Sequence, residues 1–276
     1  MASILAVGIN LMDKYLDQGI MYPGGNELNV AVYASRQGHS SAFMGVFGTD
    51  NAASYIRNVL EKEQVDCCHC RVEQGETGDA LVKLVDGERI FCGHNDGGVT
   101  GKYPIHILPE DLDYIHGFEV ASTSLYGRMP AEEVINLCNS GLPVSYDFSN
   151  HAPKALIDAL LPHLNYAFFS CAHLPQQEIM DLLYYAKALG CPCCIATQGE
   201  RGAHALYQGH MLYQPAIPVA VVDTMGAGDS FIATLLTAHA ADPTLGGMEQ
   251  ALMAAANYAS SVCMQNGAIG YSFPLS

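Results

Sequence analysis

The chain is poor in positive charge. It contains 12 Lys and Arg against 28 Asp and Glu, which gives a formal net charge of -16. Surfaces that bind nucleic acid or anionic membranes carry clustered Lys and Arg, so the composition argues against both kinds of partner. An anionic substrate must therefore be held by local dipoles, a metal ion or a few well-placed cations.

Signals for export and for the membrane are absent as well. No apolar run is long enough to span a bilayer, and no basic segment precedes the apolar residues 1–10. No Asn-x-Ser/Thr glycosylation acceptor occurs. We therefore expect a cytoplasmic protein.

The sequence has 10 cysteines, but it lacks the features of a disulfide scaffold. A chain of 276 residues, half of them hydrophobic, has enough apolar surface for a core without covalent cross-links. Two clusters, 67–70 and 191–194, raise the alternative of a zinc site. Adjacent residues of an extended segment point to opposite faces, so we favour cysteines that serve as core and loop residues.

Short apolar strands alternate with helical patterns through most of the chain. The expected strands are residues 4–9, 42–47, 118–122, 144–148, 166–169, 194–197 and 217–222. The expected helices are residues 26–37, 52–63, 131–140, 154–161, 176–189, 230–241 and 247–265. This alternation predicts one α/β domain, residues 1–276, with a mainly parallel sheet and helices on both of its faces.

Two segments, at about 12–22 and 72–98, interrupt the alternation. The second contains two apolar runs separated by Asp86-Gly87, which is a hairpin signal. The two segments together predict a small antiparallel sheet that projects from the main domain. The alternative is an extension of the edge of the main sheet.

The most informative stretch is 223–231, Asp-Thr-Met-Gly-Ala-Gly-Asp-Ser-Phe. It lies between an expected strand and an expected helix. Gly226 and Gly228 allow a tight turn, and the amide groups at a helix start suit phosphate oxygens. Asp229 is then placed to take a proton from a hydroxyl that attacks the phosphate. The alternative is that Asp229 only caps the helix.

A second glycine motif, 23–29, also precedes an expected helix. Its glycines permit backbone contact with a polar ligand, and Asn29 can both donate and accept hydrogen bonds, as sugar binding requires. The alternative is an ordinary capped helix start. A third turn, 197–202, ends an expected buried strand, where a parallel sheet commonly holds a nucleotide; a plain strand-to-strand turn fits equally well.

These motifs together resemble the ribokinase-like sugar kinases, also called the PfkB carbohydrate kinase family. The resemblance runs from residue 4 to about residue 271. It rests on the 223–229 block, on Gly24-Gly25-Asn26 with Asn29 and Ala31, and on the block 45–50. The family implies a three-layer α/β/α domain with a small β lid, and transfer of the ATP γ-phosphoryl group to a sugar hydroxyl.

The resemblance also implies roles for individual residues. Asp229 would be the catalytic base, and the amides of Gly226, Ala227 and Gly228 would form an anion hole. The sugar would contact Asp13, Gly24, Gly25 and Asn29. The nucleotide would lie along Thr197, Gly199 and Gly202, with Asn257 near its base.

Metal ions are implied as well. The cofactors would be ATP and Mg2+, together with a structural monovalent cation (K+) at the turns 223–225 and 267–271. The chain departs from the family at its magnesium motif. In place of Asn-x-x-Glu it has Ser170-Cys171-Ala172-His173, with Glu178 further on, so the sequence leaves the magnesium ligands open. A Glu that some members place near the sugar is also absent after Val120.

Within the family, the blocks 29–33, 147–149 and 223–233 are most similar to the kinases that phosphorylate fructoselysine. This likeness implies a sugar–amine substrate phosphorylated on its 6-hydroxyl. The alternatives are a kinase of a plain sugar, a sugar acid or a nucleoside, and a sugar sensor without catalytic activity. The partners would be the sugar and ATP, with a homodimer formed through the lid.

Overall fold

The main sheet has eight strands in the order β14-β13-β12-β11-β10-β9-β1-β4. The computed structural model describes residues 2–85 and 88–275. The strands from β12 to β4 are parallel to their neighbours, whereas β13 and β14 add an antiparallel edge. Their bounds are β1 Ser3–Val7, β4 Ser40–Met44, β9 Val120–Ser124, β10 Val144–Asp147, β11 Tyr166–Ser170, β12 Cys193–Thr197, β13 Ala203–Tyr207 and β14 His210–Gln214.

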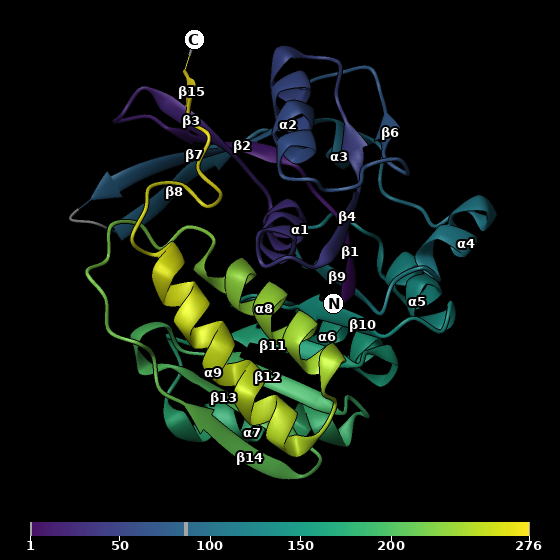
Figure 1. Cartoon of the computed structure of the whole chain (residues 1–276), viewed down its shortest axis with the longest axis vertical. Helices are drawn as coiled ribbons and strands as arrows, with labels where there is room; N and C mark the ends of the chain where they lie inside the picture. The colour runs from purple at the N-terminus through teal and green to yellow at the C-terminus, as the bar shows by residue number, and fades with distance from the viewer. Residues whose placement is uncertain (1, 86–87, 276) are drawn as a thin grey trace.

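Helices cover both faces of this sheet (Figure 1). Alternate residues of a strand point to opposite faces, so Ile4 and Ala6 of β1 join one apolar cluster and Leu5 and Val7 join the other. The first cluster holds residues of α1, α2, α8 and α9, and the second holds residues of α5, α6 and α7. The helices are α1 Asn26–Arg36, α2 Asn51–Lys62, α3 Gly98–Lys102, α4 Leu112–Ile115, α5 Ala131–Asn139, α6 Lys154–Leu160, α7 Gln176–Ala188, α8 Ala227–Ala241 and α9 Leu245–Val262. The predicted α/β fold class is therefore confirmed.

A second sheet of five strands lies beside the main domain (Figure 1) and is called the lid sheet below. Its order is β15-β3-β2-β7-β8, and it is antiparallel except where β2 meets β7. The bounds are β2 Leu11–Tyr15, β3 Ile20–Gly24, β7 Gly78–Val85, β8 Glu88–His94 and β15 Phe273–Pro274. The strands β2, β3, β7 and β8 fall largely in the two segments that interrupt the sequence pattern. The predicted Asp86-Gly87 turn lies outside the described residues.

Two sequence-based predictions are wrong in detail. Residues 217–222 form no strand: Pro218 interrupts the run, and Val221 and Val222 are exposed. Residues 42–47 form two strands, because the chain leaves the main sheet at Gly45. The short strand β5, Val46–Phe47, instead pairs with β6, Arg71–Val72.

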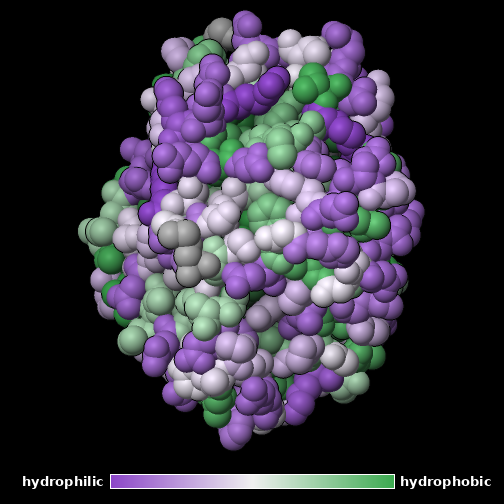
Figure 2. Space-filling view, turned by 45° about the vertical axis from the view of Figure 1, so that its right-hand side comes forward, coloured by the Kyte–Doolittle hydropathy of each residue, from purple (hydrophilic) through white to green (hydrophobic). Residues whose placement is uncertain are grey.

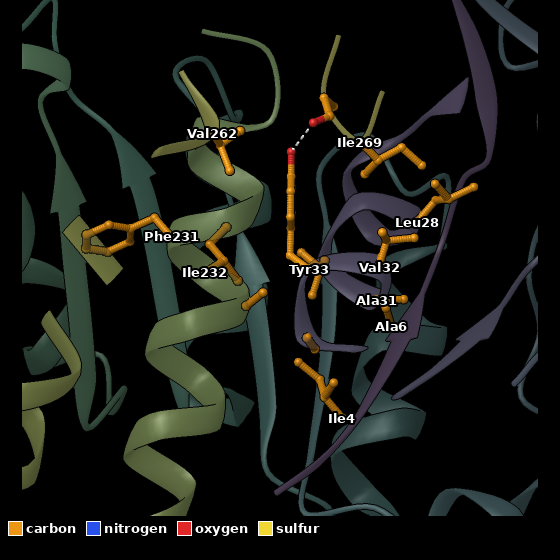
Figure 3. Close-up of a cluster of buried hydrophobic side chains, with 14 of the residues drawn as sticks. Ile4, Ala6, Leu28, Ala31, Val32, Tyr33, Phe231, Ile232, Val262 and Ile269 are labelled. Atoms are coloured by element: carbon orange, nitrogen blue, oxygen red, sulfur yellow. Dashed lines mark hydrogen bonds between the residues drawn. The ribbon is translucent and has the colours of Figure 1, made fainter. Parts of the chain in front are cut away.

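Helices α1 and α8 pack against each other through small and aromatic side chains (Figure 3). Tyr33 of α1 is fully buried between them, and its hydroxyl donates a hydrogen bond of 2.6 Å to the Ala268 carbonyl. The same hydroxyl faces Gly226, the residue before α8, which has a positive φ of 78°. A Cβ atom on Gly226 would lie 2.3 Å from the Tyr33 oxygen. Packing and backbone conformation therefore both require glycine at the start of α8.

Figure 2 shows one face of the molecule, on which hydrophilic residues surround smaller hydrophobic areas. Within residues 2–85 and 88–275, no helix is both long and apolar enough to cross a membrane.

The two glycines at the start of α8 should respond differently to alanine. Gly226→Ala places a side chain in the left-handed region and against Tyr33, so we expect a loss of about 1–3 kcal/mol in the free energy of unfolding. Gly228→Ala meets nothing within 4 Å and lies inside the helix, so it should be neutral or gain up to about 1 kcal/mol. Urea unfolding measures both. Equal losses in the two variants would contradict the packing described for Gly226.

Candidate functional site

Asp229 lies in the first turn of α8, with only 8% of its surface exposed. Two side-chain amides of α1 hold its carboxylate. Asn29 donates a hydrogen bond of 2.8 Å to Oδ2, and Asn26 donates one of 3.1 Å to Oδ1. N–H donors stabilise the negative charge of a carboxylate. The two glycine motifs, 200 residues apart in the sequence, therefore meet at one acidic group.

The turn 223–228 brings backbone amides to the same place. The Ser230 amide donates to the Gly226 carbonyl at 2.8 Å and so begins the helical ladder. The Ala227 amide makes a longer bond of 3.3 Å to the Thr224 carbonyl. The first amide groups of a helix have no carbonyl partner within that helix and carry its positive dipole end. Gly228 is exposed, so its amide is the one most open to an anion.

Residues of the lid sheet also reach the start of α1. Asp13 of β2 is buried, with its carboxylate against Gly24 at the end of β3. A Cβ atom on Gly24 would lie 2.2 Å from Asp13 Oδ2. Gly25 has a positive φ of 111° and lies against the Ile9 carbonyl. The structure therefore brings Asp13, Gly24 and Gly25 to the start of α1, next to Asn29.

A cavity of about 730 Å³ adjoins the turn before α8. The predicted residues Thr197, Gly199 and Gly202 line it, and so do Ala227 and Gly228. Its other walls are mainly apolar: Ala203, Ala216, Ile217, Pro218, Val219, Val221, Phe231, Ala256 and Ala259. The segment 217–222, wrongly predicted as a strand, thus forms a wall of the cavity. A volume of this size suits a cofactor or nucleotide.

Asn257 is the one predicted nucleotide contact that does not line the cavity. It is exposed on α9, and its side-chain amide donates a hydrogen bond of 2.8 Å to the Met253 carbonyl. Its neighbours Ala256 and Ser260 line the cavity instead.

Two acidic residues without a predicted role also belong to the site. Glu27 of α1 is buried, and desolvation raises its pKa to about 7, with a smaller contribution from the Asp229 charge. Asp147, at the carboxyl end of β10, has its pKa raised to about 7, first by burial and then by Asp229. A sequence signal existed for each: Glu27 is the only acidic residue of α1, and Asp147 ends a parallel strand.

Asp223 connects the turn before α8 to the lid sheet. Its carboxylate accepts hydrogen bonds from the Tyr15 hydroxyl at 2.6 Å, from the Met225 amide at 2.9 Å and from the Gly267 amide at 3.0 Å. Donors from three segments of the chain thus meet at this buried carboxylate.

The sequence leaves the magnesium ligands open, and the strand end 170–173, where the Asn-x-x-Glu motif is missing, carries no acidic residue. Glu178 is exposed in the first turn of α7. The carbonyls of Cys171 and Ala172 accept hydrogen bonds from Arg201. Among the residues that the structure describes, no group of three or more His, Cys, Asp or Glu could hold a metal ion.

The raised pKa of Glu27 predicts a stability that depends on pH. Ionising this buried carboxyl destabilises the fold, so stability should fall as pH rises from its unfolded pKa of 4.5 to about 7. The full effect is about 3 kcal/mol. Glu27→Gln should remove this fall, leaving the variant more stable than the wild type at pH 8. Urea unfolding at several pH values between about 5 and about 8, roughly the interval over which the carboxyl ionises, measures the free energy of unfolding of both proteins.

Glu133→Gln is the matched control. Glu133 also lies in the first turn of a helix and accepts a backbone amide hydrogen bond, from Ile107. Desolvation is outweighed there by the bonds from Ile107 and His106, so the pKa of Glu133 is lowered. The ionised Glu133 carboxyl therefore stabilises the fold at neutral pH, and this stabilisation is lost on acidification. The effect of pH is thus opposite to that expected for Glu27. If the free energy of unfolding changed with pH in the same way in Glu27→Gln and in the wild type, the raised pKa of Glu27 would be contradicted.

The chain is 38% identical over 272 residues to fructosamine kinase FrlD of Bacillus subtilis (strain 168), covering 98% of this chain and 94% of that protein. It is 31% identical over 249 residues to fructoselysine 6-kinase of Escherichia coli (strain K12), covering 89% and 92% of the two chains.

Solved structures show the same fold. Arabidopsis thaliana ribokinase complexed with ribose and ATP superposes with a TM-score of 0.82 at 23% identity, over 98% of this chain and 95% of that one. Aminoimidazole riboside kinase from Salmonella enterica gives a TM-score of 0.77 at 23% identity, over 97% and 95%. Residues 9–274 match the family described as pfkB family carbohydrate kinase. The chain therefore belongs to the pfkB family of carbohydrate kinases.

Proposed function

We propose that this protein transfers the γ-phosphoryl group of ATP to the 6-hydroxyl of a fructosamine, a sugar–amine adduct such as fructoselysine. The observation that carries the proposal is the meeting of Asp229, the Asn26 and Asn29 amides and the turn 226–228 beside a cavity of about 730 Å³. The 38% identity to a fructosamine kinase over nearly the full length of both chains supports the substrate class.

The sugar would lie between the lid sheet and the start of α1. Asp13 and Asn29 offer a carboxylate and an amide there, which are suitable partners for sugar hydroxyls. The absence of side chains at Gly24 and Gly25 lets the ligand approach the backbone. Asp229 lies at the end of this site that faces the cavity, where the reacting hydroxyl would be placed.

The reaction is an in-line phosphoryl transfer. Asp229 takes the proton of the sugar hydroxyl as that oxygen forms a bond to the γ-phosphorus, and the bond from phosphorus to the bridging oxygen breaks to release ADP. The amides of Gly226, Ala227 and Gly228, at the positive end of α8, stabilise charge on the transferring group. The lid sheet excludes water, which would otherwise accept the phosphoryl group.

The apolar walls of the cavity would hold the base and ribose of ATP, with the phosphates directed to Gly228. Mg2+ takes most of its ligands from phosphates and water when it binds with a nucleotide, and it neutralises phosphate charge. A monovalent cation near 223–225 and 267–271, and pairing of two chains through the lid sheet, stay predictions from the resemblance.

Asp229→Asn tests the catalytic base. The amide has nearly the same shape but cannot accept the proton, so we expect kcat to fall about 10³-fold while sugar binding changes little. Coupled detection of ADP measures turnover, and calorimetry measures binding. A variant that keeps more than a tenth of the wild-type kcat would exclude Asp229 as the base.

A substrate panel tests the reaction itself. Fructoselysine should be phosphorylated with the highest kcat/KM, ahead of fructose, ribose, a sugar acid and a nucleoside, because two relatives of more than 30% identity are a fructosamine kinase and a fructoselysine 6-kinase. Mass spectrometry of the product would locate the phosphate on the 6-hydroxyl. Preference for a nucleoside, or no turnover with any member of the panel, would refute the proposal.

A further inference from the structure

Three buried oxygen atoms at the site have no hydrogen-bond partner among the described residues. They are Glu27 Oε1, Thr123 Oγ1 and Asn29 Oδ1. A buried acceptor left without a donor costs free energy. Such atoms need a donor that the chain itself does not supply, from a water molecule or from a ligand.

Two of these oxygens face the same glycine. A Cβ atom on Gly127 would lie 2.7 Å from Glu27 Oε1 and 3.1 Å from Thr123 Oγ1. Both oxygens therefore lie next to Gly127, just beyond the carboxyl end of β9. The other carboxyl oxygen of Glu27 accepts the Ile9 amide hydrogen bond at 3.1 Å, which fixes the direction of the side chain. The nearby Ser124 hydroxyl favours the ionised form of Glu27 but makes no hydrogen bond to Oε1.

The charge around these oxygens is negative. The Asp229 charge raises the pKa of both Glu27 and Asp147, and the pKa of the adjacent Tyr146 is raised by burial and then by Glu27 and Asp147. Among the described residues, no lysine or arginine forms an ion pair with Glu27 or Asp147. A neutral ligand would leave this repulsion in place, whereas a cation would relieve it.

We infer that Glu27 and Thr123 bind the protonated amine of a 1-amino-1-deoxyketose, and so select a sugar–amine adduct over the plain sugar. The inference rests on the proposed function for the sugar part of this ligand. A secondary ammonium has one positive charge and two N–H donors, which match an unpartnered carboxyl oxygen and an unpartnered hydroxyl oxygen. Glu27 acts here as a specificity residue and takes no part in proton transfer to Asp229.

Binding without nucleotide tests the inference independently of turnover. The probes are an N-alkyl fructosamine and the 1-O-alkyl fructose with the same alkyl chain, which lacks the positive charge. We expect the wild type to prefer the amine by about 10- to 100-fold. Because the pKa of Glu27 is about 7, binding of the cation at that pH should also release roughly half a proton. Calorimetry in two buffers of different ionisation enthalpy measures both quantities.

Two variants and one control test whether Glu27 causes the preference for the amine. Glu27→Gln should abolish both the preference and the proton release from this group. Gly127→Ala places a methyl group against Glu27 Oε1, so it should lower the preference by covering the same oxygen. Glu133→Gln, which removes a carboxyl from the first turn of α5, should keep both properties of the wild type.

The outcomes separate this inference from the proposed function. Equal weakening of both probes by Glu27→Gln would show that the residue only supports the fold, and would overturn the inference. So would a wild type that binds the two probes equally, or that binds neither. Selective binding of the amine without phosphorylation of any sugar would uphold the inference and refute the kinase proposal. Phosphorylation of fructosamines with unchanged selectivity in Glu27→Gln would uphold the kinase proposal and overturn the inference.

Discussion

The hydrogen bond of 2.8 Å between the Asn29 amide and the Asp229 carboxylate joins the two helices on which the site depends. Helices α1 and α8 both begin at the carboxyl edge of the main sheet, and they pack against each other around Tyr33 (Figure 3). Packing of the core thus determines the position of the acidic group. A change that shifts either helix alters the polar contact before it exposes any apolar surface.

Much of the fold could be predicted because strand and helix patterns alternate so regularly. The failures have a common cause: an apolar run does not reveal which surface it covers. Residues 217–222 are as apolar as a buried strand, yet they form the wall of a cavity. The run 42–47 is broken at Gly45, where the chain crosses to the short β5–β6 pair. Only the position of neighbouring segments decides these cases.

The site was predictable wherever the backbone itself imposes a residue type. Gly226 and Gly25 have positive φ, so their motifs are visible in the sequence. Glu27 and Asp147 are different, because the raised pKa of each comes from burial beside Asp229, which lies far away in the chain. Asn257 is exposed on α9 and its amide bonds the Met253 carbonyl, whereas its neighbours Ala256 and Ser260 line the cavity, so its role near a nucleotide stays a prediction.

The Asp223 carboxylate links the lid sheet to the turn before α8. It ties the Tyr15 hydroxyl of the lid sheet and the Gly267 amide to the turn that precedes Gly226. Hydrogen bonds to a charged group are among the stronger ones. A displacement of β2 away from the main domain would break the bond from Tyr15. The position of the lid sheet and the conformation of the turn before α8 are therefore linked through one carboxylate.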